Sequence, residues 1–164
     1  FETGTIKKNF SETDFIGDIA NPAIETIEPQ LQEKGMTLGR NYKENIDTVI
    51  CDPALIKIVI VNLLGNAVKY GREKGAIQIT ISREEQSISC AIWNEGPGFP
   101  EKERKKLFRK FSRLESPELM KRKGTGIGLY TSWKIIKLHD GRIWGKSEEG
   151  KWAEFGFNIP TKNS

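Results

Sequence analysis

Residues 52–70 read DPALIKIVIVNLLGNAVKY, and this stretch decides how the chain folds. Asp52 is a good N-cap residue, and Pro53 suits the first position of a helix because the N–H that proline lacks would be unpaired there anyway. We therefore predict a helix from this point to about Tyr70. One apolar stripe along it should face a core; its members are Ile56, Ile60, Leu63 and Ala67.

A second face of this predicted helix is polar. Its side chains recur at helical spacing, so they should stand close together; they are Asn62, Asn66, Lys69 and Tyr70. A carboxamide oxygen is a neutral, hard ligand that can hold Mg²⁺ already neutralised by nucleotide phosphates, and a lysine offers those phosphates a positive charge. A solvated helix face would show the same pattern, so this segment alone leaves both interpretations open.

Alternating apolar residues downstream of this helix predict two hairpins. Apolar and polar residues alternate in 77–81 and in 88–92, on either side of a polar turn, as expected of two strands with one solvent-exposed face. Residues 142–147 and 153–159 repeat the pattern around a short turn. Helices interspersed with antiparallel hairpins indicate an α+β fold, a two-layer sandwich with the helices on one face of the sheet.

The region upstream of Asp52 is less regular. A helical pattern opens at Ser11 and ends near Gly35, and its prolines, Pro22 and Pro29, predict a kink or a break. Two short apolar runs, 36–41 and 48–51, could pair with each other as strands. Residues 1–10 show no periodicity and are predicted to be a linker from an upstream region, which leaves 11–164 as one domain.

Composition narrows the possible functions. The chain has 164 residues, 37% hydrophobic and 29% charged, with a net charge of +4, and this fits a globular domain better than a disordered segment. Acidic and apolar residues interrupt the densest basic cluster, at 102–113, so we expect no nucleic-acid partner. Cys51 and Cys90 have no metal-ligand spacing and are predicted to be reduced core thiols in a cytosolic setting.

Two glycine-rich segments lie further along the chain. One, GTGIGLY at 124–130, leaves backbone amides bare just ahead of a predicted helix, whose partly positive N-terminus attracts anions. Its spacing fits neither a Walker A loop nor a dinucleotide fingerprint. The other, NEGPGFP at 94–100, follows a predicted strand and would let a flat ligand approach the backbone. Each could also be an ordinary connection between elements.

Taken in order, these segments resemble the catalytic ATP-binding domain of sensor histidine kinases. Residues 62–70 look like its N box, 94–100 like its first glycine box, 107–113 (LFRKFSR) like its F box and 124–129 like its second glycine box. The resemblance covers about residues 11–160. It implies that residues 1–10 are a linker from an upstream dimerisation region and that 11–164 are the ATP-binding catalytic domain. It implies the Bergerat ATP-binding fold, a mixed, mostly antiparallel sheet backed by about three helices, with nucleotide held under a mobile lid.

Residue roles follow from this resemblance position by position. It makes Asn66 the Mg²⁺ ligand, with Asn62 supporting the phosphate side, and it makes Asn66, Lys69 and Arg113 the catalytic set. Phe108 and Phe111 would anchor the lid, which spans 101–123. The implied nucleotide-binding residues are Asn62, Asn66, Lys69, Tyr70, Asn94, Gly96, Gly98, Lys123, Gly124, Thr125, Gly126, Ile127, Gly128 and Leu129.

One position departs from the family pattern. Asn94 stands where these domains usually have an aspartate that accepts a hydrogen bond from the adenine amino group. Asparagine keeps an acceptor oxygen but loses the charge, which should weaken nucleotide binding by roughly 5–30-fold. Glu95 is not expected to take over this role. His139 is expected to be a helix cap or surface residue and not a phosphoacceptor, and the tryptophans are expected in the core.

The resemblance implies a protein-histidine kinase that binds Mg-ATP and passes the γ-phosphate to a histidine on a separate dimerisation domain of the same protein, with a response regulator downstream. The isolated domain should be a monomer that binds nucleotide but barely turns it over, whereas the parent chain should be a homodimer. We expect a cytoplasmic location, with membrane anchoring of the parent left open. The alternative is a catalytically weak nucleotide-sensing or scaffolding module, because of Asn94.

Overall fold

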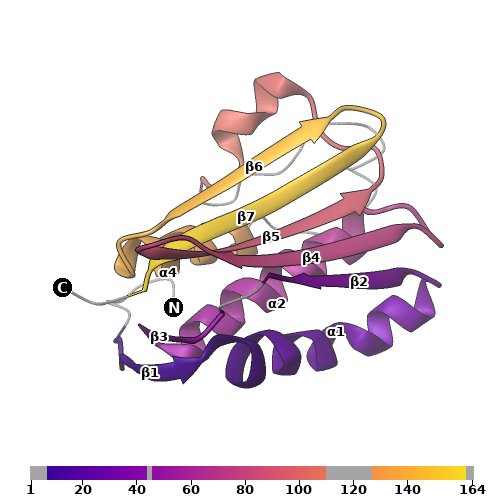
Figure 1. The fold of residues 1–164 in the computed structure, drawn as a ribbon. Coiled ribbons are helices and arrows are strands. Elements are labelled where there is room, and N and C mark those ends of the chain that lie inside the picture. The colour runs from indigo at the N-terminus through magenta and orange to yellow at the C-terminus, as the bar shows by residue number, and fades with distance from the viewer. Residues whose placement is uncertain (1–6, 44–45, 110–126, 162–164) are drawn as a thin grey trace.

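The computed structural model describes residues 7–43, 46–109 and 127–161. A five-stranded sheet has the order β2-β4-β5-β7-β6 (Figure 1). β2 pairs in parallel with β4, and the other neighbouring strands are antiparallel, so the predicted mixed, mostly antiparallel sheet is confirmed. The strands are β2 (Thr37–Tyr42), β4 (Ala76–Arg83), β5 (Ser87–Glu95), β6 (Arg142–Glu148) and β7 (Trp152–Pro160).

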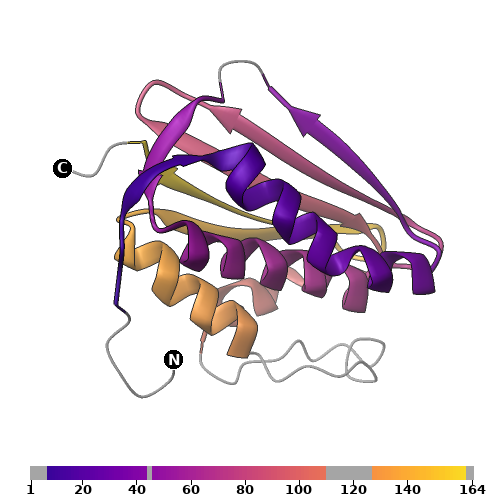
Figure 2. The ribbon, with the colours of Figure 1, turned by 90° about the horizontal axis from the view of Figure 1, so that it is seen from below.

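Among the described residues, three α-helices cover one face of this sheet, which confirms the two-layer architecture. They are α1 (Asn21–Glu33), α2 (Pro53–Tyr70) and α4 (Ile127–Leu138). Figure 2 shows them side by side, with α2 in the middle. Two short helical segments flank these elements: η1 (Phe15–Ala20), a π-helix that leads into α1, and η2 (Glu101–Lys106), a 3₁₀ helix after β5.

The core lies between α2 and the sheet. Inward residues of β4, β5 and β7 alternate with outward ones, and the apolar stripe predicted for α2 is fully buried against them. α2 begins as predicted, with the Asp52 carboxylate accepting from the N–H of Leu55 at 3.1 Å. By length and mean hydropathy (1.3) α2 could cross a membrane, but here it is a core helix that packs against α1, α4 and the sheet.

The predicted start of the first helix at Ser11 is wrong. Residues Ser11–Asp14 form strand β1, which pairs antiparallel with β3 (Thr48–Cys51). Helical structure begins only after Asp14, whose side chain accepts from the N–H of Gly17 at 3.1 Å. Pro22 lies where the π-helical turn becomes α1, so one proline does mark an irregularity, whereas α1 continues through the exposed Pro29.

The predicted pairing of 36–41 with 48–51 is also wrong. Both runs are strands, but β2 joins the edge of the main sheet beside β4, and β3 pairs with β1. β3 is further tied to the end of β7, because the N–H of Ile50 donates to the carbonyl of Thr161 at 3.1 Å. Local alternation predicts that a segment is extended, but it does not specify which distant segment becomes its neighbour.

Candidate functional site

The polar face of α2 meets the start of α4. The side-chain amide of Asn62 donates to the carbonyl of Gly128 and to the hydroxyl of Ser132, each at 3.2 Å. The described end of the second glycine-rich segment therefore lies against the first asparagine of this face. Asn66 stands one turn further along α2, is half-buried, and makes no side-chain hydrogen bond to any residue that the structure describes.

The end of α2 carries the next two predicted residues. Lys69 is exposed in the last turn, whereas Tyr70 is half-buried and packs against the core. The ammonium group of Lys34 donates to the carbonyl of Val68 at 2.8 Å, so a second lysine also places positive charge at this helix end. This charge complements the partly negative C-terminus of α2.

Asn94 lies near the end of β5 and is almost completely buried, with 3% of its surface exposed. Its side-chain NH₂ donates to the carbonyl of Glu95 at 3.1 Å, which fixes the orientation of the amide. The Glu95 carboxylate accepts from the N–H of Ala76 at 2.7 Å, so this side chain has a structural partner. That contact agrees with the prediction that Glu95 does not replace the missing aspartate.

The glycines after Asn94 lie close to the protein's own backbone. A Cβ on Gly96 would come within 2.9 Å of the carbonyl oxygen of Tyr70, and one on Gly98 within 2.7 Å of that of Trp152. Gly98 also has a φ of +63°, which other residues rarely adopt. The first glycine cluster is thus packed tightly between the end of α2 and the β6–β7 hairpin, and its contact with adenine stays a prediction.

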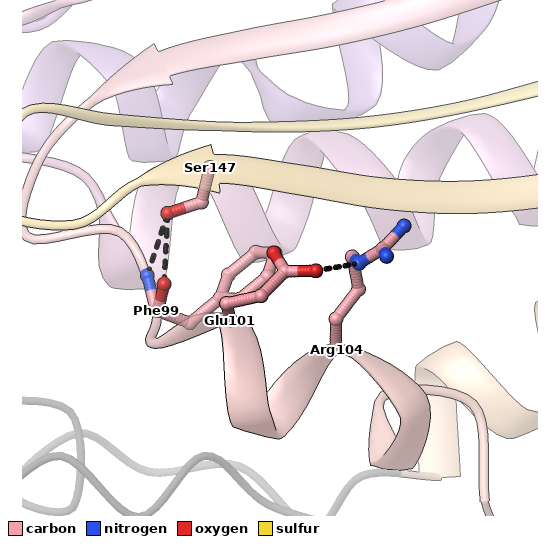
Figure 3. Close-up of polar contacts among 4 residues, drawn as sticks. All are labelled: Phe99, Glu101, Arg104 and Ser147. Carbon is pink, nitrogen blue, oxygen red and sulfur yellow. Dashed lines mark hydrogen bonds and ion pairs between the residues drawn. The ribbon is translucent and has the colours of Figure 1, made fainter.

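Ser147 on β6 anchors this cluster. Its hydroxyl accepts from the N–H of Phe99 at 2.9 Å and donates to the Phe99 carbonyl at 3.0 Å (Figure 3). Just beyond, Arg104 pairs with Glu101 at 2.7 Å on the exposed side of η2. Sequence reasoning missed Ser147; the available signal was a serine at an inward-facing position of an alternating strand.

Part of the predicted lid is described, up to Arg109. Phe108 packs edge-on against Phe155 with ring centroids 6.3 Å apart, and Leu107 is buried, so this end of the lid is held by the core. Glu103 is also buried, and its Oε2 has no hydrogen-bond partner among the described residues. Leu129 packs against the core. Outside the described residues lie Phe111, Arg113, Lys123, Gly124, Thr125 and Gly126, together with the side chain of Ile127.

His139 is buried, so the surface alternative of the prediction is wrong. Its Nε2 accepts from the backbone N–H of Asp52 at 3.1 Å, Nδ1 contacts the Ile135 carbonyl at 2.8 Å, and Phe10 stacks on the ring at 4.7 Å. The contact of its ring with a carbonyl in the last turn of α4 fits the helix-cap alternative. Burial lowers the pKa of His139, and the Ile135 carbonyl and the Asp52 charge oppose this only in part. The residue joins the end of α4 to the start of α2.

The tryptophans do not form the core that was expected. Trp133 is 37% exposed on α4, and Trp93, Trp144 and Trp152 are half-buried on the sheet. The cysteines do match expectation, because both are free and buried. Burial raises the pKa of Cys51 to about 11 and raises that of Cys90 further, so both thiols stay protonated at neutral pH.

Fold and site together define an α+β nucleotide-binding domain, in which an asparagine-bearing helix lies against a glycine-rich helix start. A family model described as "Histidine kinase-, DNA gyrase B-, and HSP90-like ATPase" matches residues 51–163. The chain belongs to this family.

Comparisons with individual proteins support this family assignment. The chain is 34% identical over 146 residues to the adaptive-response sensory kinase SasA of Synechococcus sp. (strain JA-3-3Ab), covering 88% of this chain but 38% of that protein. The nucleotide-free catalytic domain of the histidine kinase ThkA superimposes with a TM-score of 0.81 at 29% identity, covering 94% of this chain and 99% of that one. ThkA in complex with the response regulator protein TrrA matches with a TM-score of 0.78 at 26% identity, covering 94% of this chain and 42% of that one.

Proposed function

We propose that this chain is the ATP-binding kinase domain of a sensor histidine kinase, which binds Mg-ATP and delivers the γ-phosphate to a histidine on a separate domain. The observation that carries the proposal is the contact between Asn62 of α2 and Gly128 at the start of α4. It brings the asparagine face beside a helix N-terminus, and such a terminus favours phosphate.

The residues present fit a magnesium-bearing triphosphate. Asn66 offers a carboxamide oxygen that no described residue uses, and the bound cation would neutralise charge on the phosphates. Lys69 would add positive charge, Tyr70 would contact the nucleotide, and Arg113 would approach the γ-phosphate. The contribution of this chain would therefore be positioning and charge neutralisation.

The side-chain oxygen of Asn94 would accept a hydrogen bond from the adenine amino group. Its NH₂ is turned toward the Glu95 carbonyl, which directs the acceptor oxygen the other way. An acceptor in this orientation supports retained but weakened adenine recognition.

The partners lie outside this chain, which spans about 38% of the curated relative it matches. We propose a histidine-bearing dimerisation domain of the same protein as the phosphate acceptor and a response regulator as the next recipient. The isolated domain would be a monomer within a homodimeric parent, working in the cytoplasm where ATP is available.

Phosphate transfer from labelled ATP to a supplied histidine-containing domain tests the proposal. Transfer should require Mg²⁺ and should fall by at least about 100-fold in Asn66→Ala, because the cation loses its protein ligand. Lys57→Ala, which removes a half-buried lysine near the other end of α2, is the matched control and should transfer normally. Equal transfer by wild type and Asn66→Ala would contradict the proposal.

One observation favours a second candidate, a nucleotide-sensing or scaffolding module: the adenine position holds a carboxamide in place of a carboxylate. Titration with ATP, with and without Mg²⁺, separates the two. Mg-dependent binding together with transfer supports the kinase. Binding without transfer to any supplied histidine domain supports the sensing module, and no binding at millimolar ATP supports a scaffold.

A further inference from the structure

Ser132 is a polar residue in an apolar interface. It lies on α4, none of its surface is exposed, and its helical neighbours Ile135 and Ile136 are equally buried. Its hydroxyl accepts one hydrogen bond from Asn62 at 3.2 Å, and the same amide group gives its other hydrogen to the Gly128 carbonyl. Both hydrogens of the Asn62 amide are thus directed at α4.

We infer that Asn62 and Ser132 are positioning residues, which together fix the start of α4 on α2 and so set its distance from Asn66. The inference rests on the proposed function and refines it, because the resemblance alone assigned Asn62 to the phosphates. With both amide hydrogens used, Asn62 has none left to donate to a phosphate oxygen. Its effect on nucleotide passes through the helix that it holds.

Directional bonds are needed at this interface because apolar packing alone does not fix one register. Two helices that touch through aliphatic side chains can slide or rotate at small cost, whereas a buried polar pair has one satisfied arrangement. α4 lies in contact with the Asn62 side chain at this point, since a Cβ placed on Gly128 would stand 3.6 Å from the Cγ of Asn62, an ordinary van der Waals distance. The contact therefore sets the first turn of α4, whose N–H groups face the proposed phosphates.

Four variants of the 164-residue chain test this pair: Ser132→Ala, Asn62→Ala, the double variant, and Thr131→Ala as matched control. Thr131→Ala removes a hydroxyl from the same helix without touching the Asn62 contact. Ser132→Ala should weaken Mg-ATP binding by about 3–10-fold, as expected for one lost hydrogen bond. Asn62→Ala loses the bonds to both Ser132 and Gly128, so it should weaken binding by at least as much. The Mg-ATP affinity of the double variant should be about equal to that of the single variant that binds less tightly, because both substitutions remove the same contact.

The affinity for AMP in the absence of Mg²⁺ is the control measurement, because it would fall if a substitution disturbed the whole fold. It depends on the adenine end of the site, so it should stay within about twofold in every variant. Equal loss of AMP and Mg-ATP binding would mean that Ser132 merely supports the fold. Loss in Asn62→Ala with no loss in Ser132→Ala would mean that Asn62 touches the phosphates itself, and either result overturns the inference.

Amide hydrogen exchange tests, without any nucleotide, whether Asn62 and Ser132 hold the start of α4. Amides at 128–132 should exchange at least about threefold faster in Ser132→Ala than in wild type or Thr131→Ala, while those of β4 and β5 stay unchanged. Unchanged exchange at 128–132 would overturn the inference. Wild type that fails to bind Mg-ATP would refute the proposed function, and exchange would still report whether Asn62 and Ser132 hold α4.

Discussion

At the scale of single residues, the side-chain NH₂ of Asn94, which an aspartate would lack, should affect both nucleotide affinity and stability. This NH₂ donates to the Glu95 carbonyl, so the asparagine is adapted to its own buried surroundings. An aspartate would replace that donor with a second acceptor facing a carbonyl oxygen. The same change would give the adenine amino group a charged partner, so nucleotide affinity and stability should move in opposite directions.

Asn94→Asp should raise ATP affinity by about 5–30-fold, because a carboxylate accepts a stronger hydrogen bond. It should also lower the free energy of unfolding of the nucleotide-free protein by about 1–3 kcal/mol, because a buried oxygen loses its donor contact. Calorimetric titration and urea unfolding measure the two effects. An unchanged affinity would remove Asn94 from the adenine site.

His139 should make stability depend on pH. Burial places its pKa below the usual value of 6.5, so at mildly acidic pH the unfolded chain binds a proton that the folded protein does not. This contribution to stability is complete above about pH 6.5, falls as the pH drops toward the folded pKa, and then levels off. His139→Gln should remove it, so the wild-type minus variant difference in unfolding free energy should shrink from pH 7.5 to 5.5. A difference that is constant with pH would contradict this.

At the scale of elements, α2 combines a buried apolar surface and a polar surface on one helix. Its apolar stripe is buried under the sheet, while Asn62 lies at its boundary with α4 and Asn66 follows one turn later on the polar face. Gly65 lies between these surfaces, and nothing stands within 4 Å of where its Cβ would be. Glycine is therefore not required there for packing, in contrast to Gly98 in the turn after β5.

Gly65→Ala should stabilise the protein by about 0.5–1 kcal/mol, because alanine restricts the unfolded chain and suits a helix interior. Gly98→Ala should destabilise it by more than about 2 kcal/mol, since a Cβ at φ +63° would meet Ser147 and Trp152. Paired thermal and urea unfolding curves compare the two substitutions. Equal effects of the same sign would show that these backbone positions do not differ as described.

At the scale of the whole molecule, Asp52 joins three segments that are distant in sequence. Its two carboxylate oxygens accept from Leu55 in α2 and from the backbone of Asn9 at 2.7 Å, and its own N–H donates to His139 after α4. The segment that enters the domain from upstream is thereby held against two of its helices. Phe10 strengthens the contact by stacking on His139.

Asp52→Ala should lower the free energy of unfolding by about 2–3 kcal/mol, the sum of a lost helix cap and a lost buried hydrogen bond. Amide exchange of residues 7–10 should rise by more than that of β4 or β5. Asp47→Ala, at an exposed aspartate nearby, is the control and should change stability by less than about 0.5 kcal/mol. Unchanged exchange at 7–10 would show that Asp52 does not hold the entering segment.

Local signals predicted most elements of this molecule. The cap and proline at 52–53 marked the start of α2, and strict alternation marked β4 to β7, because both patterns act over a few residues. The order of the motifs predicted the family. The same signals failed at Ser11–Asp14, where Ser11, Thr13 and Asp14 suggested a helix start but residues 11–14 pair with β3 as a strand.

The sequence by itself determined which segments are helices and strands downstream of Asp52, the two-layer class, and the asparagine face with its glycine-rich counterpart. Only the tertiary structure decided that β2 joins β4, that His139 is buried under Phe10, and that Asn62 gives its amide hydrogens to Gly128 and Ser132. The physical reason is the distance along the chain over which each kind of interaction acts. Capping and periodicity depend on residues a few positions apart, whereas these contacts join residues far apart in the chain, and they exist only once the core has brought their elements together.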